Sequence, residues 1–351
     1  MLSILKKWVD QIFAEEEALL LLVLIIASLL IIITMGTVLA PVITSMIFAF
    51  MMQGMIVKLR QKNVPQWLAL LIAFVVFIGS FFILLFVVVP MAWQQMSNLF
   101  NELPRMMGQW QQLLMLLPEQ YPTLISEAQI QEWVGLAKAE LGKIGQWVVS
   151  FSLSTIPNLL AVLIYLILVP ILVFFFLKDR EFILNWLAGF LPHERPLLRQ
   201  VWAEMNQQVA NYVRGKALEI LIVGVVSYIS FVILGLNYAA LLALLVGLSV
   251  LIPYIGATVV TLPVLLIGYF QWGWGSEFIT LMIVYGIIQM LDGNVLVPLL
   301  FSEAVNLHPI AIILAVLVFG GIWGFWGIFF AIPLATLIKA VMTAWPQAKT
   351  V

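Results

Sequence analysis

The chain has 351 residues, of which 64% are hydrophobic and 9% are charged, and its formal net charge is −1. Soluble globular proteins are roughly half apolar and a quarter charged, so this composition excludes a soluble fold and predicts an all-α polytopic membrane protein. The lack of cysteine excludes disulfides and thiolate metal sites. No signal-peptide cleavage pattern is recognisable near Met1, and we expect no cofactor and no bound metal.

Apolar runs of about 20 residues, the length that crosses a bilayer, follow one another along the chain. Pro90 is expected to close the third of these runs, whereas prolines inside the fourth are tolerated in a membrane helix. With two longer runs near the C-terminus and the apolar stretch between them, we expect about eight transmembrane helices. The first five runs cover residues 18–35, 41–57, 67–89, 150–177 and 217–234.

Residues 91–148 differ from their surroundings because charged side chains recur within them. Their aromatic and Leu/Met residues are spaced as on one face of a surface helix, while Pro104, Pro118 and Pro122 are expected to divide the segment into short pieces. We therefore predict a small helical insert outside the bilayer.

The distribution of Lys and Arg predicts the orientation of the chain. If both termini are cytoplasmic, thirteen of the sixteen Lys and Arg residues, Lys216 among them, fall on the cytoplasmic side. Only Arg105, Lys138 and Lys143 fall on the other side, as the positive-inside rule requires. The insert at 91–148 is therefore predicted to be extracytoplasmic.

The expected organisation has five parts. They are an N-terminal amphipathic segment with three transmembrane helices (1–90), the insert (91–148), a fourth transmembrane helix with a cytoplasmic amphipathic basic segment (149–216), a transport core with interrupted helices (217–345) and a cytoplasmic tail (346–351).

Two runs in the C-terminal half, residues 239–270 and 309–338, are too long for simple spans. Each would measure about 45 Å as a straight helix, against a hydrocarbon core of roughly 30 Å. The first is interrupted at residues 252–256 (IPYIG) and the second at residues 320–327 (GGIWGFWG). Broken apolar segments in corresponding positions are typical of a transporter binding site. Each run is either a kinked span, which we prefer, or a re-entrant hairpin, and both alternatives stay open.

Asp292 is the main candidate for chemistry, because an acid inside an apolar run is costly and usually binds a cation, relays a proton or hydrogen-bonds a substrate. No Lys or Arg occurs between residues 217 and 338. Gln289 and Asn294 add polar groups near Asp292. The alternative is that Asp292 ends a helix and caps backbone amides.

Three further polar residues are candidates beside simpler interpretations. Glu219 could couple an ion, although a surface ion pair with Lys216 or Arg214 is the preferred interpretation. Glu303 is expected in an exposed loop. His308 is a candidate pH sensor because His titrates near neutral pH, or it caps the start of a helix.

Residues at the backbone breaks are a separate class of candidate. Carbonyls and amides that a break frees can line a binding site, and the alternative is close helix packing through small residues. The residues concerned are Pro253, Tyr254, Gly256, Gly293, Pro298, Gly321 and Gly324.

Four ordered motifs resemble those of the AI-2E family of transporters: NYVRGK at 211–216, IPYIG at 252–256, QMLDGNVLVP at 289–298 and NLHP at 306–309. The resemblance covers essentially the whole chain and is loosest over the insert. It implies an eight-span protein of the bacterial inner membrane that forms a homo-oligomer. Family members are assigned to export of the signal autoinducer-2, or to exchange of sodium or lithium against protons, so the resemblance does not fix a substrate.

The expected function is secondary transport of a small polar solute or a monovalent cation, coupled to a proton or sodium gradient. Membrane lipid and the solute are the expected partners, without nucleic acid. ATP-driven transport is disfavoured because the sequence has no Walker-type phosphate loop, and no paired-aspartate, zinc-helix or Gly-x-Ser-x-Gly pattern indicates an enzyme. Two alternatives remain: an oligomeric channel or passive pore, and a membrane scaffold that presents residues 91–148 to a partner.

Overall fold

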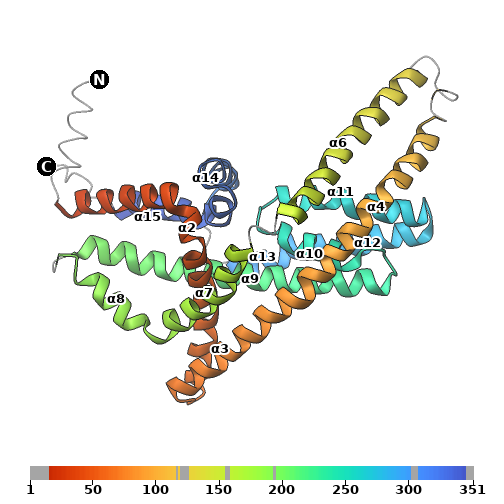
Figure 1. Ribbon diagram of the computed structural model, residues 1–351. Coiled ribbons are helices and arrows are strands. Elements are labelled where there is room, and N and C mark those ends of the chain that lie inside the picture. The colour runs from red at the N-terminus through yellow and green to blue at the C-terminus, as the bar shows by residue number, and fades with distance from the viewer. Residues whose placement is uncertain are drawn as a thin grey trace, which may run out of the picture.

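The computed structural model describes residues 16–115, 118, 126–154, 159–192, 195–301 and 307–344. This part of the chain is helical, without a strand, and Figure 1 shows a bundle beyond which one pair of helices extends. Seven described helical segments are long and apolar enough to cross a membrane, or eight if one bent pair counts as a single span. The predicted all-α polytopic fold is confirmed.

Helix α2 (Glu16–Gln61) contains the first two predicted spans in one continuous helix. Its segments Leu19–Gly36 and Val38–Gln61 each satisfy the length and hydropathy of a span. Figure 1 shows the helix changing direction along its length. The two apolar runs are therefore joined by a bend, without an intervening loop.

Helices α3 (Gln66–Ile83) and α7 (Leu159–Lys178) pack against the C-terminal part of α2. Ala69 and Ala73 of α3 are fully buried in this contact, because small side chains let membrane helices approach closely. Phe77 fills the space beside them. These three helices form the first of the two packed halves of the molecule.

Helix α3 continues through a π-helical turn, η1 (Leu84–Val88), into α4 (Val89–Leu114). The expectation that Pro90 closes this span is wrong. The Val89 N–H donates to the Leu84 carbonyl, five residues earlier, and this wider turn accommodates a proline whose missing N–H would interrupt a regular α-helix. Pro104 likewise lies inside α4 without breaking it.

Helices α4 and α6 (Glu127–Ser154) lie side by side and form an arm that extends beyond the bundle in Figure 1. Lys138 Nζ donates a hydrogen bond to Gln111 Oε1 at 2.9 Å and joins the two helices. The insert is therefore helical as predicted, but it consists of two long helices instead of short pieces. Pro122 lies in residues 119–125, outside the described part of the chain.

After a bend of 77° the chain passes from α7 into the short helix α8 (Arg180–Ala188). Helix α9 (Pro196–Ile233) then runs for 38 residues. This single helix contains both the predicted amphipathic basic segment and the fifth predicted span, and it is continuous across the predicted boundary between residues 216 and 217. The middle of α9 therefore carries charged side chains into the interior of the protein.

The first interrupted run forms a hairpin of α10 (Ala239–Ser249) and α11 (Ile255–Trp272). Gln271, at the end of α11, lies beside the start of α10. Its Nε2 donates to the Gly235 carbonyl, and its Oε1 accepts from the Asn237 N–H, both at 2.7 Å. The preference for a kinked span is wrong for this run, because the chain reverses at the break and its two ends lie together.

The second interrupted run, α14 (Pro309–Phe329) and α15 (Ala331–Ala344), also folds back on itself. The chain reverses direction at Gly324, whose φ of +57° lies in the left-handed region that glycine adopts readily. Ala331 consequently packs against Ala315. The preference for a kinked span is wrong for this run too. A proline kink would only bend the helix, whereas the residue at positive φ reverses the direction of the chain.

One uninterrupted helix, made of α12 (Ser276–Leu291), η2 (Asp292–Leu296) and α13 (Val297–Phe301), connects the two hairpins. Its length and hydropathy are those of a membrane span. The core of this half of the molecule joins α9, α10, α11 and α12. Its most deeply buried members are Phe231, Leu242, Val246, Val264 and Leu281.

The hairpin geometry of α10 and α11 can be tested by cross-linking, because the chain has no native cysteine. We expect Asn237→Cys combined with Gln271→Cys to be bridged by a single molecule of a short bifunctional maleimide, measured as the added mass of one linker. The control pair, Asn237→Cys with Tyr254→Cys, should instead add two linkers, each attached at one end, since Tyr254 lies at the opposite end of the hairpin. A kinked span would hold residues 237 and 271 about 50 Å apart, so addition of two linkers to the Asn237/Gln271 pair would contradict the hairpin.

The turn of the same hairpin requires a residue without a side chain. A Cβ atom at Gly256 would lie 1.8 Å from the Ser249 carbonyl oxygen. We expect Gly256→Ala to lower the free energy of unfolding in micelles by about 1–3 kcal/mol through overpacking. Gly286→Ala is the matched control, because nothing lies within 4 Å of that position on α12. Equal stability of the two variants would show that the arms do not meet at Gly256.

Candidate functional site

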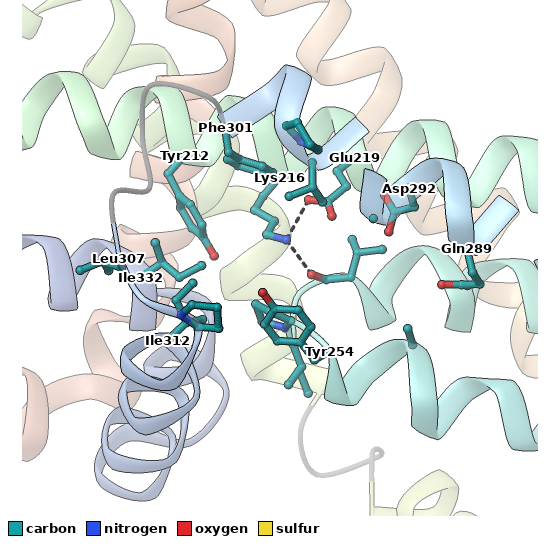
Figure 2. A pocket seen from close by; sticks show the side chains of 18 residues that line it. Tyr212, Lys216, Glu219, Tyr254, Gln289, Asp292, Phe301, Leu307, Ile312 and Ile332 are labelled. Carbon is teal, nitrogen blue, oxygen red and sulfur yellow. Dashed lines mark hydrogen bonds and ion pairs between the residues drawn. The ribbon is translucent and has the colours of Figure 1, made fainter. Parts of the chain in front are cut away.

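A cavity of about 460 Å³ lies where α9, the tip of the α10–α11 hairpin, the η2 turn and the start of α14 meet (Figure 2). Its wall is mainly apolar, but three charged side chains line it: Lys216, Glu219 and Asp292. Helix breaks and the helices packed on them thus enclose a space in the half of the molecule where the sequence predicts a transport core.

The ammonium group of Lys216 lies at the centre of this cavity wall. Lys216 and Glu219 are three residues apart on α9, so they share one face of the helix, and they are only 4% and 2% exposed. Lys216 Nζ lies 2.8 Å from Glu219 Oε2 and donates to the Val250 carbonyl at 2.7 Å (Figure 2). It also lies 5.2 Å from the centroid of the Phe301 ring, a favourable place for a cation.

The sequence predicts the partner of Glu219 correctly but places the pair wrongly. An ion pair with Lys216 is confirmed, whereas its expected position at the surface is wrong, because the α10–α11 hairpin and Phe301 cover it. Arg214 points elsewhere, with its Nε donating to the Ala210 carbonyl. Lys216 itself is a site residue that sequence reasoning counted as a cytoplasmic charge. The signal was present, since a Lys and a Glu three residues apart open an apolar run.

Asp292, at the start of η2, also lines the cavity, and Figure 2 shows its carboxylate beside that of Glu219. It is 9% exposed, and its Oδ1 atom has no hydrogen-bond partner within the described residues. The alternative role as a helix-end cap is wrong, because the helix continues through η2 into α13. Two carboxylates and one ammonium therefore line the cavity, which gives the ionised groups a net charge of −1.

The η2 turn explains how Asp292 comes to face the cavity. Val297 N–H donates to the Asp292 carbonyl, five residues earlier, and Pro298 follows directly. This π turn replaces regular α-helical bonding ahead of a proline, as η1 does ahead of Pro90. Asn294 does not line the cavity, because its Nδ2 donates to the Met290 carbonyl at 2.9 Å. Its amide satisfies the backbone where the hydrogen-bonding pattern changes.

The hairpin tip contributes strained backbone to the cavity. Tyr254 has φ +63° and ψ −49°, and the Ile255 N–H donates to the Pro253 carbonyl at 2.7 Å. This is a γ-turn with positive φ, which costs a non-glycine residue about 1–3 kcal/mol and persists only where the surroundings hold it. Both Pro253 and Tyr254 line the cavity, so the strain lies at the predicted site.

The remaining candidates divide into those that line the cavity and those that do not. Gln289, Gly293 and Pro298 line it, whereas Gly256, Gly321 and Gly324 are absent from its wall and lie at the turns of the two hairpins. His308 caps α14, since its Nδ1 accepts from the Ile310 N–H at 3.3 Å, and this agrees with the capping interpretation. Glu303 lies outside the described residues.

Comparison with known proteins finds one family and several relatives that match nearly the whole chain. The sequence profile described as AI-2E family transporter matches residues 19–347. The chain is 47% identical over 349 residues to "Putative permease PerM" of Escherichia coli (strain K12), with 99% of each chain covered. It is 29% identical over 317 residues to "Putative transport protein YueF" of Bacillus subtilis (strain 168), with 88% of this chain and 84% of that protein covered. This multi-pass membrane protein therefore belongs to the AI-2E family of transporters.

Proposed function

We propose that the protein is a secondary transporter of the bacterial inner membrane, driven by a proton or sodium gradient, and that the Lys216–Glu219–Asp292 cavity is its coupling site. The observation that carries the proposal is the charge of that cavity. Two buried carboxylates and one ammonium line it; the ammonium pairs with Glu219, and one carboxylate oxygen of Asp292 has no hydrogen-bond partner among the described residues. Binding of one proton or one monovalent cation would make the site neutral.

Charge balance gives the coupling ion a physical role. Ionised groups inside a membrane protein are costly and are retained where they bind ions, relay protons or pair with one another. Glu219 is paired with Lys216, so Asp292 is the group whose charge a proton or cation would offset. During a conformational change, moving a neutral site through the apolar interior then costs less free energy than moving a charged one.

Lys216 links the ionic state of the site to the hairpin. The same ammonium binds Glu219 on α9 and the Val250 carbonyl at the end of α10. A cation that enters between the carboxylates competes with the ammonium for Glu219, which would weaken the contact between α9 and the hairpin tip. Alternating access is largely the rocking or gating of one part of a transporter against another around a fixed site, and differential binding of the cation to the two states would drive such a movement of the hairpin against α9.

The size of the cavity is consistent with a small solute. A volume of about 460 Å³ lies within the roughly 300–1,000 Å³ of small-molecule sites. Gln289 and Tyr254 add hydrogen-bonding side chains to its wall. We propose as substrate a small polar solute, such as a signalling molecule, or a monovalent cation. The basic residues other than Lys216 still support cytoplasmic termini, and assembly as a homo-oligomer is proposed from the family resemblance alone.

The central prediction concerns Asp292→Asn, which removes the unpaired carboxylate with almost no change of shape. In proteoliposomes with an imposed pH gradient, we expect the variant to lose the proton movement that wild-type protein shows when Na⁺, Li⁺ or a candidate polar solute is added, read with a pH-sensitive dye. Glu277→Gln is the control, because Glu277 lies on the same helix in the first turn of α12 and does not line the cavity.

Three outcomes separate the functions. Loss of flux in Asp292→Asn and on collapse of the gradient supports coupled transport. Flux that neither the variant nor the collapse changes would leave a passive pore as the better description. If the cellular phenotype survives Asp292→Asn but disappears when residues 91–148 are deleted, the protein acts as a scaffold and the coupled-transport proposal is wrong.

The buried ion pair also makes a prediction about stability. We expect Lys216→Met to lower the free energy of unfolding in micelles by about 3–5 kcal/mol, because Glu219 is left as an unpaired buried charge. The double variant Lys216→Met/Glu219→Gln should recover a large part of this loss, since neither group is then charged. Equal losses in the single and double variants would show that the pair is not the source of the effect.

A further inference from the structure

A second, smaller cavity lies at the end of the bundle where α2 ends, α3 begins and α7 bends into α8. Its volume is about 150 Å³, too small for a typical solute site. Four helix termini converge on it, and the packed core of α2, α3 and α7 lies directly beside it. The lining residues from α2 are Gln53, Ile56 and Arg60, and those from α3 are Gln66 and Leu70.

The charge of this cavity favours an anion. Arg60, Lys178 and Arg180 line it, against Asp179 and Glu181. None of these three cations forms an ion pair with the described part of the chain. Lys178 Nζ lies 5.9 Å from the centroid of the Phe174 ring. Arginine guanidinium groups match the geometry of phosphate oxygens. The cavity thus offers a phosphate group two arginine side chains that form no ion pair with the described residues.

The surface beside the cavity indicates that the phosphate belongs to a lipid. Helix α8 turns away from α7 by 77° and carries Phe182 and Trp186 four residues apart, on one face. Phe190 follows in the turn after α8, and its ring packs against Trp186 with the ring centroids 4.9 Å apart, so it extends this aromatic face. Phe182 and Phe190 are 73% and 72% exposed, so no described part of the protein covers this face. A short helix with an exposed aromatic face, next to basic residues at the end of membrane spans, is typical of the membrane interface.

We propose that this cavity binds the phosphate group of an anionic phospholipid, with Arg60 and Arg180 as its main ligands and the acyl chains lying against the aromatic face of α8. A free phosphate ion would use the same arginines but would gain nothing from Phe182, Trp186 and Phe190. The site is separate from the Lys216–Glu219–Asp292 cavity and shares no lining residue with it. The result of a lipid-binding experiment at this cavity is therefore independent of the transport proposal.

The test measures lipid that stays bound to the purified full-length protein. Wild-type protein and variants are reconstituted into phosphatidylcholine nanodiscs that contain a minor fraction of phosphatidylglycerol, and retained lipids are counted by native mass spectrometry after transfer to detergent. We expect Arg60→Gln/Arg180→Gln to retain at least about tenfold less phosphatidylglycerol, because it loses charge-assisted hydrogen bonds to phosphate. Retention of phosphatidylcholine should not change.

Two further variants keep the test decisive. Lys58→Gln/Lys62→Gln removes two charges from the same end of α2 at positions that do not line the cavity, and it should retain phosphatidylglycerol as wild type does. Arg60→Lys/Arg180→Lys keeps the charge but removes the guanidinium geometry, so intermediate retention is expected even if the glutamine variant folds poorly.

Three results would overturn the proposal. Equal loss of phosphatidylglycerol in the Lys58/Lys62 variant would show that general surface charge attracts the lipid. Wild-type retention in both arginine variants would show that the cavity is not the site. Displacement of phosphatidylglycerol by inorganic phosphate alone would show that the cavity recognises the free anion and that α8 plays no part.

Discussion

The interior of the C-terminal half depends on where one ammonium group donates its hydrogen bonds. Helix α10 has only 11 residues and ends at the wall of the cavity, where the last carbonyls of a helix have no partner within the helix. Lys216 donates to one of them, that of Val250, and also pairs with Glu219. A positive charge at a helix C-terminus is further favoured by the helix dipole. The break in the hairpin and the buried acid on α9 therefore stabilise each other through the same group.

Proline and the π turn form a second recurring arrangement. Both described π turns, η1 and η2, lie directly ahead of a proline, Pro90 or Pro298, and in both the helix continues past the proline. At η1 the result is a long helix that leads from the bundle into the α4–α6 arm. At η2 the same arrangement puts Asp292 on the cavity wall. The same π turn, which accommodates the missing N–H of a proline, therefore extends a helix in one half of the molecule and positions a charged residue in the other.

The sequence predicts the class of fold and the neighbourhood of the site, because both depend on patterns that are local in the chain. Apolar runs of span length mark the helices, and the motif at 289–298 marks Asp292. The hairpins could not be predicted, since a kinked span and a re-entrant hairpin have similar hydropathy and lead to the same predicted side for the C-terminus. The role of Lys216 depends on the Val250 carbonyl, 34 residues away, and a backbone carbonyl leaves no mark in a sequence.

These features together explain how acids can be kept inside an apolar bundle. If Glu219 and Asp292 had no basic partner, the cavity would carry two uncompensated negative charges, a costly state in a membrane interior. With Lys216 in place the ionised cavity carries a net charge of −1, and part of that charge lies beside the ammonium and the end of α10. Under the proposed coupling, an external cation would enter beside the ammonium that the protein itself supplies. Competition between the two, more than the affinity of either alone, would then determine whether the hairpin tip stays bound to α9.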